Sequence, residues 1–173
     1  MIRPDQRRTT VVHQQDADAD DGRDETHNER ADRNWNELLQ ELRVTQTGTQ
    51  ILTGFLLTIP FQQRFADLDA FQTDLYLVLV VLAVLATALF VAPVSLHRIL
   101  FGRRLKPELV TAGGRFARAG LLVLALVMAG SAMLIFDVVL SRDAGRAVGI
   151  ASLVLLFASW WVVPRVIASR ARD

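Results

Sequence analysis

Four apolar stretches of 17 to 20 residues follow one another after residue 43, and they constrain the fold more than any other feature of the sequence. A helix rises 1.5 Å per residue, so about 20 residues span the roughly 30 Å hydrocarbon core of a bilayer. The stretches cover residues 44–61, 75–94, 119–136 and 147–163. The sequence therefore predicts an all-α membrane protein whose four transmembrane helices form an up-down bundle.

Residues 1–33 have a different character. They are highly charged, include an acidic run over 16–25, and carry few large apolar side chains. Such a segment cannot bury enough apolar surface to offset the entropy lost on ordering. We expect a disordered cytoplasmic arm over 1–33, a four-helix transmembrane domain over 34–168 and a basic tail over 169–173.

A short amphipathic pattern precedes the first apolar stretch. Its apolar residues recur at i, i+3, i+4 and i+7, and they are Trp35, Leu38, Leu39 and Leu42. This spacing predicts an amphipathic helix that lies at the membrane surface with Trp35 as its anchor. The alternative is a continuous extension of the first span.

The distribution of positive charge predicts the orientation of the chain. Of the 19 Lys and Arg residues, all but Arg64, Arg142 and Arg146 precede the first stretch, lie in 95–118 or follow the fourth stretch. Lys and Arg accumulate on the cytoplasmic side of membrane proteins. We therefore expect an inner-membrane protein with both termini in the cytoplasm. The main alternative is a re-entrant first segment, which leaves three true spans.

Small residues mark the faces on which helices can approach closely. In the third stretch these residues are Ala125 and Ala129. At the start of the fourth they are Gly145, Gly149 and Ser152. Such patterns predict close helix packing without identifying a particular partner.

The first stretch also carries a polar stripe, Gln46, Gln50 and Thr53, whose spacing places the three side chains on one helix face. A side-chain amide in hydrocarbon costs free energy unless it has hydrogen-bond partners. The preferred interpretation is that the stripe points into the bundle and bonds to neighbouring helices. The alternatives are a polar path or small-ligand site beside this helix, and the seam of a homo-oligomer.

Three motifs resemble a known bacterial family. They are Glu-Leu-Arg-Val-x-Gln-Thr-Gly-x-Gln-Ile-Leu over 41–52, Phe-Leu-Leu-Thr-Ile-Pro-Phe over 55–61, and Ala-Pro-x-x-x-His-Arg over 92–98. The family comprises small four-span membrane proteins of unknown function, some of which carry the label sodium:proton antiporter. The resemblance covers about residues 33–168. It implies an integral membrane protein, and it carries over no functional residue.

Ion exchangers usually place a titratable carboxylate near the membrane midplane. The first, second and fourth stretches contain no Asp or Glu, and Asp137 lies at the outer end of the third. The preferred interpretation of Asp137 is a boundary carboxylate satisfied by water or a nearby Arg. The alternative is a carboxylate that gathers protons or cations at the outer mouth of a path.

The sequence offers little other chemistry. It contains no Cys, no Gly-rich phosphate loop, no metal-ligand spacing and no Ser with His and Asp companions. We therefore expect no catalytic residue, no metal, no cofactor and no enzymatic activity. A net charge of +1 gives no reason to expect nucleic acid. The expected partners are the lipid bilayer and a second copy of the chain or another membrane protein. A structural or accessory role through helix contacts is the leading hypothesis, and a small cation/proton transporter is the alternative.

Overall fold

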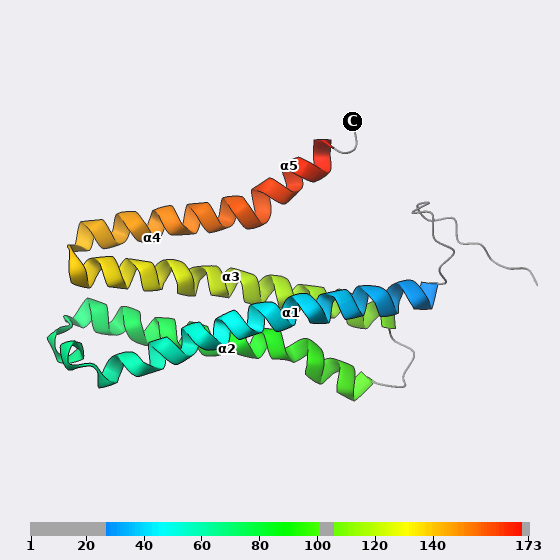
Figure 1. Ribbon diagram of the computed structural model, residues 1–173, viewed down its shortest axis with the longest axis horizontal. Helices are drawn as coiled ribbons and strands as arrows, with labels where there is room; N and C mark the ends of the chain where they lie inside the picture. The colour runs from blue at the N-terminus through cyan, green and yellow to red at the C-terminus, as the bar shows by residue number, and fades with distance from the viewer. Residues whose placement is uncertain (1–26, 101–105, 171–173) are drawn as a thin grey trace, which may run out of the picture.

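The computed structural model describes residues 27–100 and 106–170, and nearly all of them are helical (Figure 1). The predicted disordered arm lies outside the described residues up to 26, whereas residues 27–33 form the first turns of a helix. The elements are α1 (His27–Thr58), η1 (Ile59–Phe61), η2 (Gln63–Asp67), α2 (Ala70–Leu100), α3 (Lys106–Val139), α4 (Arg142–Phe157), η3 (Ala158–Val162) and α5 (Val163–Arg170).

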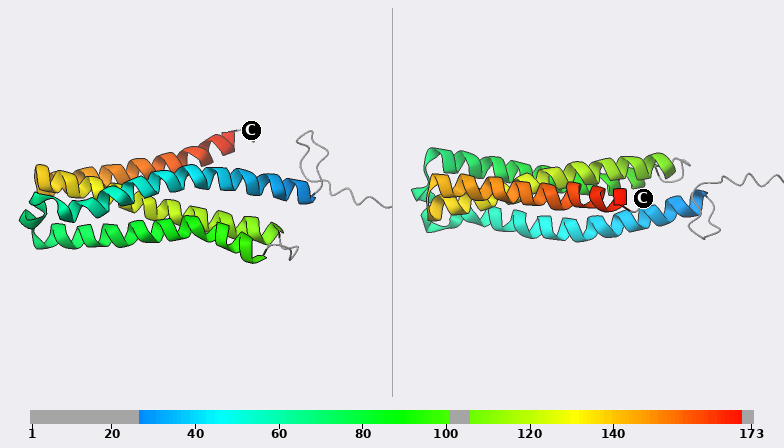
Figure 2. Two further views of the ribbon diagram at one scale, coloured as in Figure 1. Left: turned by 60° about the horizontal axis from the view of Figure 1, so that its bottom comes forward. Right: turned by 90° about the horizontal axis from the view of Figure 1, so that it is seen from above.

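The helices alternate in direction, so the up-down order predicted from the sequence is confirmed (Figure 1). In Figure 1, α3 lies between α4 on one side and the pair α1 and α2 on the other, and the right view of Figure 2 shows α1 and α2 on opposite sides of α4. Within the described chain, the backbone of α4 lies close to that of α3 but not to that of α1 or α2. The protein is therefore a three-helix bundle of α1, α2 and α3 with α4 laid on the outer side of α3, and the four helices do not surround one shared core.

The bundle core follows a seven-residue repeat. The buried residues of α1 are Trp35, Leu42, Thr49 and Leu56, and those of α2 include Tyr76, Leu79, Ala83, Ala86, Phe90 and Pro93. A repeat of seven keeps one seam of a helix facing its neighbours, because seven residues complete almost two helical turns. The repeat explains why these long helices stay in contact over most of their length.

Glycines on α3 supply the holes into which large side chains of α1 and α2 insert. An added Cβ at Gly120 would lie 2.5 Å from the Phe90 ring, and one at Gly113 would lie 2.9 Å from the Leu38 side chain. The pair Gly113 and Gly114 does not interrupt α3, which runs unbroken from Lys106. The third apolar stretch, predicted over 119–136, is therefore the second half of a longer helix.

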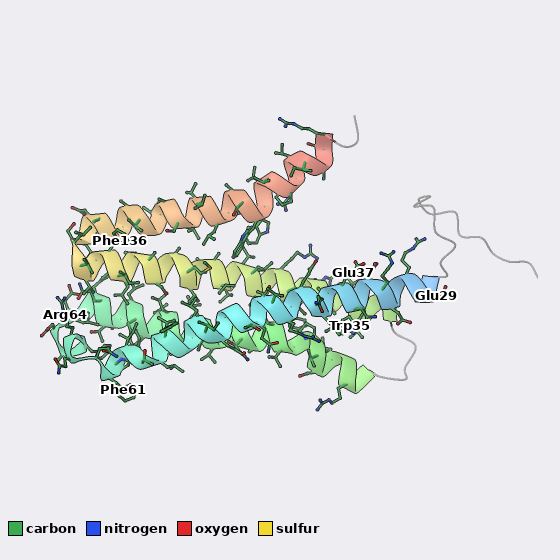
Figure 3. All side chains as sticks on the ribbon, viewed as in Figure 1. Glu29, Trp35, Glu37, Phe61, Arg64 and Phe136 are labelled. Atoms are coloured by element: carbon green, nitrogen blue, oxygen red, sulfur yellow. The ribbon has the colours of Figure 1, made fainter. Side chains whose placement is uncertain are left out.

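Helix α1 differs from its prediction in two respects. The amphipathic segment and the first apolar stretch form one continuous helix, so the surface helix expected at its start is wrong. Trp35 is 7% exposed and packs near Gly113, because that glycine leaves room for its indole ring. Figure 3 places Glu29 and Glu37 at this end of the molecule, while Phe61 and Arg64 lie at the opposite end.

Among the described residues, three helices are long and apolar enough to cross a membrane. They extend over Ala70–Leu96, Leu109–Val139 and Arg142–Arg170, and only 6% of the apolar 18-residue window of the third is buried. Helix α1 is not among them, since its polar residues lower its hydropathy. Length and composition therefore give three candidate spans where the sequence pattern predicted four.

The end of α4 changes geometry around Pro164. Residues 158–162 form a π-helical turn, and α5 then diverges from α3 (Figure 1). Proline has no N–H to donate to the carbonyl four residues before it, so the regular α-helical ladder cannot continue through residue 164. Trp160 packs against the core cluster of Leu42, Ala86, Phe90 and Leu124 and joins this region to the bundle.

Candidate functional site

The carboxylate of Asp137, in the last turn of α3, is the buried charged group of the described chain. Its side chain is 2% exposed. The Gln72 amide donates a hydrogen bond to Oδ1 at 2.6 Å, and Nε of Arg142 lies 2.7 Å from Oδ2. The latter contact lacks hydrogen-bond geometry and is an ion pair. Asp137 is therefore a buried carboxylate whose charge is balanced by a neighbouring guanidinium.

The sequence around residue 70 places Gln72 by a local capping motif. Asp69 precedes α2, and its carboxylate accepts a hydrogen bond from the Gln72 backbone N–H at 2.9 Å. The Gln72 side chain in turn accepts one from the Asp69 N–H at 3.0 Å. This reciprocal pair is a capping box, which fixes the first turn of the helix. The capping box uses the side-chain oxygen of Gln72, and the side-chain nitrogen is directed toward Asp137 on α3.

Arg142 joins the same group from the start of α4. Ser141 caps that helix by accepting a hydrogen bond from the Ala144 N–H at 3.3 Å. The Arg142 guanidinium then reaches both Asp137 and Asp69 and lies 4.0 Å over the Phe71 ring. A cation gains attraction from an aromatic face at such a distance. We call Asp69, Gln72, Asp137 and Arg142 the polar latch, because it ties α2, α3 and α4 together at one end.

The close approach of α4 to α3 depends on Gly145. A Cβ added there would lie 2.7 Å from the Met133 carbonyl oxygen and 2.8 Å from the Asp137 Cβ. One turn later, a Cβ on Gly149 would lie 2.9 Å from the Met133 side chain. The small-residue faces predicted on these helices are confirmed at Ala125, Ala129, Gly145 and Gly149, all of which are buried, and Ser152 is half-buried.

The predicted stripe on α1 does not point into the bundle. Gln50 is exposed, Gln46 and Thr53 are half-buried, and Thr49 is the buried residue at this level. The Thr53 hydroxyl bonds to the Thr49 carbonyl of its own helix at 2.8 Å. Within the described residues, the side-chain amides of Gln46 and Gln50 have no hydrogen-bond partner. The prediction of inward-facing hydrogen bonds is therefore wrong for Gln50, since the seven-residue repeat turns the Thr49 side of α1 inward.

The helices that form the bundle all lie within one family match. The match covers residues 24–164 and has the description "Family of unknown function (DUF6328)". The chain belongs to the DUF6328 family. This finding agrees with the predicted resemblance to an uncharacterised family. Comparison with curated proteins and with solved structures found no match.

In this DUF6328 protein, the described residues contain no group of three or more His, Cys, Asp or Glu that could hold a metal ion. The polar latch has two carboxylates, one guanidinium and one amide, and each of its side chains bonds to another member. The sequence predicts that Asp137 is satisfied by water or a nearby Arg, and Arg142 is that partner. The sequence reasoning missed Gln72, which also contacts Asp137, and Asp69, which contacts Gln72 and Arg142. The Asp-x-x-Gln spacing of the capping box is a detectable local signal, whereas nothing local signals the contact between Gln72 and Asp137.

A second polar contact satisfies a backbone carbonyl near the end of α1. The Tyr76 hydroxyl donates a hydrogen bond to the Leu56 carbonyl at 3.1 Å, and both residues are buried. Pro60 lies four residues after Leu56 and has no N–H to donate to that carbonyl. Tyr76 therefore supplies the donor that the proline cannot. Phe65 packs edge-on against the Tyr76 ring at 5.3 Å.

Replacing Tyr76 with Phe is expected to lower the free energy of unfolding by about 1–3 kcal/mol, the cost of an unpaired buried polar group. Pro60→Ala restores a backbone donor, so we expect it to recover part of the loss in the Tyr76→Phe background. Equilibrium unfolding of the wild type, both single variants and the double variant in detergent measures the coupling. Additive effects would show that Pro60 does not create the need for Tyr76.

Proposed function

We propose that this DUF6328 protein is a multi-pass inner-membrane protein in which α1 forms a fourth span. Helix α1 packs beside the apolar segments of α2 and α3, so it shares their depth in the bilayer. The hydroxyls of Thr45, Thr47, Thr49 and Thr53 each bond to the carbonyl four residues earlier. These bonds reduce the cost of placing threonine in hydrocarbon.

The proposed orientation places both termini in the cytoplasm and the polar latch outside. The asymmetry of Lys and Arg supports it. Reporter proteins fused after Gln72 and after Arg142 are expected to lie outside, and fusions after Lys106 and Arg170 inside. An external reporter at Lys106 would contradict this orientation.

We further propose that the protein is not an enzyme and acts as a structural or accessory membrane protein through helix–helix contacts. The observation that carries this proposal is the state of Asp137. Among the described residues it is the one buried carboxylate, and it is already paired with Arg142 at the end of the bundle. A carboxylate held in this way stabilises contacts between helices, and its position at the helix end does not suit ion exchange across the midplane.

A small cation/proton transporter is the second candidate. The observation that favours it is the same carboxylate, because Asp137 is a buried acidic side chain that lies 2.7 Å from the Arg142 guanidinium. This role requires a path that reaches Asp137 from both sides of the membrane.

Purified full-length protein in liposomes separates the two candidates. A sodium gradient is imposed, and a pH dye inside the vesicles reports proton movement. We expect no protein-dependent pH change. The matched control is Asp137→Asn, which retains side-chain size and removes the charge. A sodium-driven pH change that is lost in Asp137→Asn would overturn the structural role and support transport.

A further inference from the structure

The side-chain amide of Gln50 has no hydrogen-bond partner within the described bundle. The side chain is exposed on α1. The neighbouring Thr47 is also exposed, but its hydroxyl bonds to the Arg43 carbonyl at 2.9 Å. A side-chain amide carries two donors and an acceptor, so one bond to a carbonyl of its own helix cannot satisfy all of its polar groups.

The depth of Gln50 makes this exposure costly. Leu52 packs against both core clusters, one containing Leu79 and Ala83 and the other Ala86 and Phe90. Gln50 is two residues from Leu52, which corresponds to about 3 Å along the helix. It therefore lies beside the middle of the apolar stretch of α2 over 75–94. If α1 spans the bilayer as proposed above, the Gln50 amide lies near the midplane, where water does not satisfy it.

The surface around Gln50 has the composition of a helix contact. We define the Gln50 face as Thr47, Gln50, Gly54 and Leu57, which are all exposed and recur at helical spacing. A Cβ added at Gly54 meets nothing within 4 Å, so the glycine is not required for packing inside the chain. Helix α4 does not pack along this face, since its backbone is not close to that of α1 in the described chain.

We propose that the Gln50 face is the contact surface for a second copy of this chain. Two copies in one membrane share their orientation, so a two-fold axis along the membrane normal brings the same residue of each copy together. The amide is self-complementary, because the carbonyl of one Gln50 accepts from the amide N–H of the other. Gly54 allows the two α1 helices to approach closely beside this pair. The inference rests on the proposed membrane-spanning role of α1 and deepens it by naming the partner.

Disulfide cross-linking in native membranes tests the contact, since the chain contains no Cys. Thr47→Cys retains Gln50 and is expected to form a covalent dimer under mild oxidation. Gly48→Cys is the matched control, because it is exposed at nearly the same depth but lies on another side of α1, with nothing within 4 Å of its Cβ. We expect little dimer from it. Equal cross-linking at both positions, or none at Thr47→Cys, would overturn the proposal.

Two further variants test the chemistry in the uncross-linked protein. Gln50→Leu is expected to weaken self-association about 3-fold to 18-fold for each interhelical hydrogen bond lost, as measured by energy transfer between labelled copies in liposomes. Gln50→Asn keeps a side-chain amide, so it is expected to weaken self-association less than Gln50→Leu does. Gly54→Leu is expected to reduce association without loss of fold, whereas Gly48→Leu leaves association unchanged.

A water-filled path beside α1 is the competing explanation for Gln50. In that case Gln50→Cys would react rapidly with a bulky water-soluble maleimide, and this result would also overturn the dimer contact. The sodium-gradient experiment is independent of these measurements. If ions cross the membrane and Thr47→Cys still forms a dimer, the structural role is wrong and the Gln50 contact stands. If no dimer forms and no ions cross, the Gln50 contact is wrong and the structural role stands.

Discussion

Replacing Gly145 with Val is expected to separate α4 from α3 and to lower the free energy of unfolding by about 3 kcal/mol, the upper part of the usual range for overpacking. The added atoms meet the Met133 carbonyl oxygen at 2.7 Å and the Asp137 backbone nitrogen at 2.9 Å. Backbone atoms inside a helix cannot move aside as a flexible side chain can. The whole of α4 must therefore shift away, since α3 is its main contact.

Gly114→Val provides the matched control for this prediction. Gly114 also lies within a helix, but a Cβ there meets nothing within 4 Å. We expect its stability to be unchanged or slightly higher, because Val has a better helix propensity than Gly. Thermal and denaturant unfolding of both variants in detergent would measure the difference. A Gly145→Val protein as stable as the control would contradict the close approach of α4 to α3.

Removing the guanidinium of Arg142 is expected to have an effect of similar size through a different cause. Arg142→Ala leaves the Asp137 carboxylate buried without its charge partner, and such losses cost about 3–5 kcal/mol. We expect the lower part of that range, because the Arg142 side chain is itself 32% exposed and water reaches it. Unfolding in detergent measures this loss.

A double variant shows whether the cost comes from the unpaired charge. Asp137→Leu combined with Arg142→Met removes both charges and is expected to recover most of the stability. Arg146→Ala is the control for a surface pair, since Arg146 and Asp143 are 58% and 93% exposed and such pairs contribute about 0–1 kcal/mol. If Arg142→Ala were no worse than Arg146→Ala, the polar latch would have no role in stability.

Local sequence pattern did not predict which face of α1 turns toward the other helices. The sequence predicts that the stripe of Gln46, Gln50 and Thr53 faces inward, because polar groups in a membrane need hydrogen-bond partners. The structure turns Thr49 inward and leaves Gln50 exposed. A threonine hydroxyl can bond to its own helix, so Thr49 is buried at low cost, and the side of α1 that fits the holes on α3 decides the rotation.

Local sequence by itself determined the apolar helical segments of this protein and the small-residue faces at Ala125, Ala129, Gly145 and Gly149. These features depend on residues within a few turns of each other, where spacing and hydrophobicity act directly.

Only the tertiary structure decided that α4 packs along α3, outside the bundle of α1, α2 and α3, and that Asp137 meets Gln72, which is 65 residues away. It also decided that Trp35 packs near Gly113 instead of anchoring a surface helix. Such contacts depend on shape complementarity between distant segments, and a hole left by a glycine on one helix is visible only when the side chain that fills it is in place.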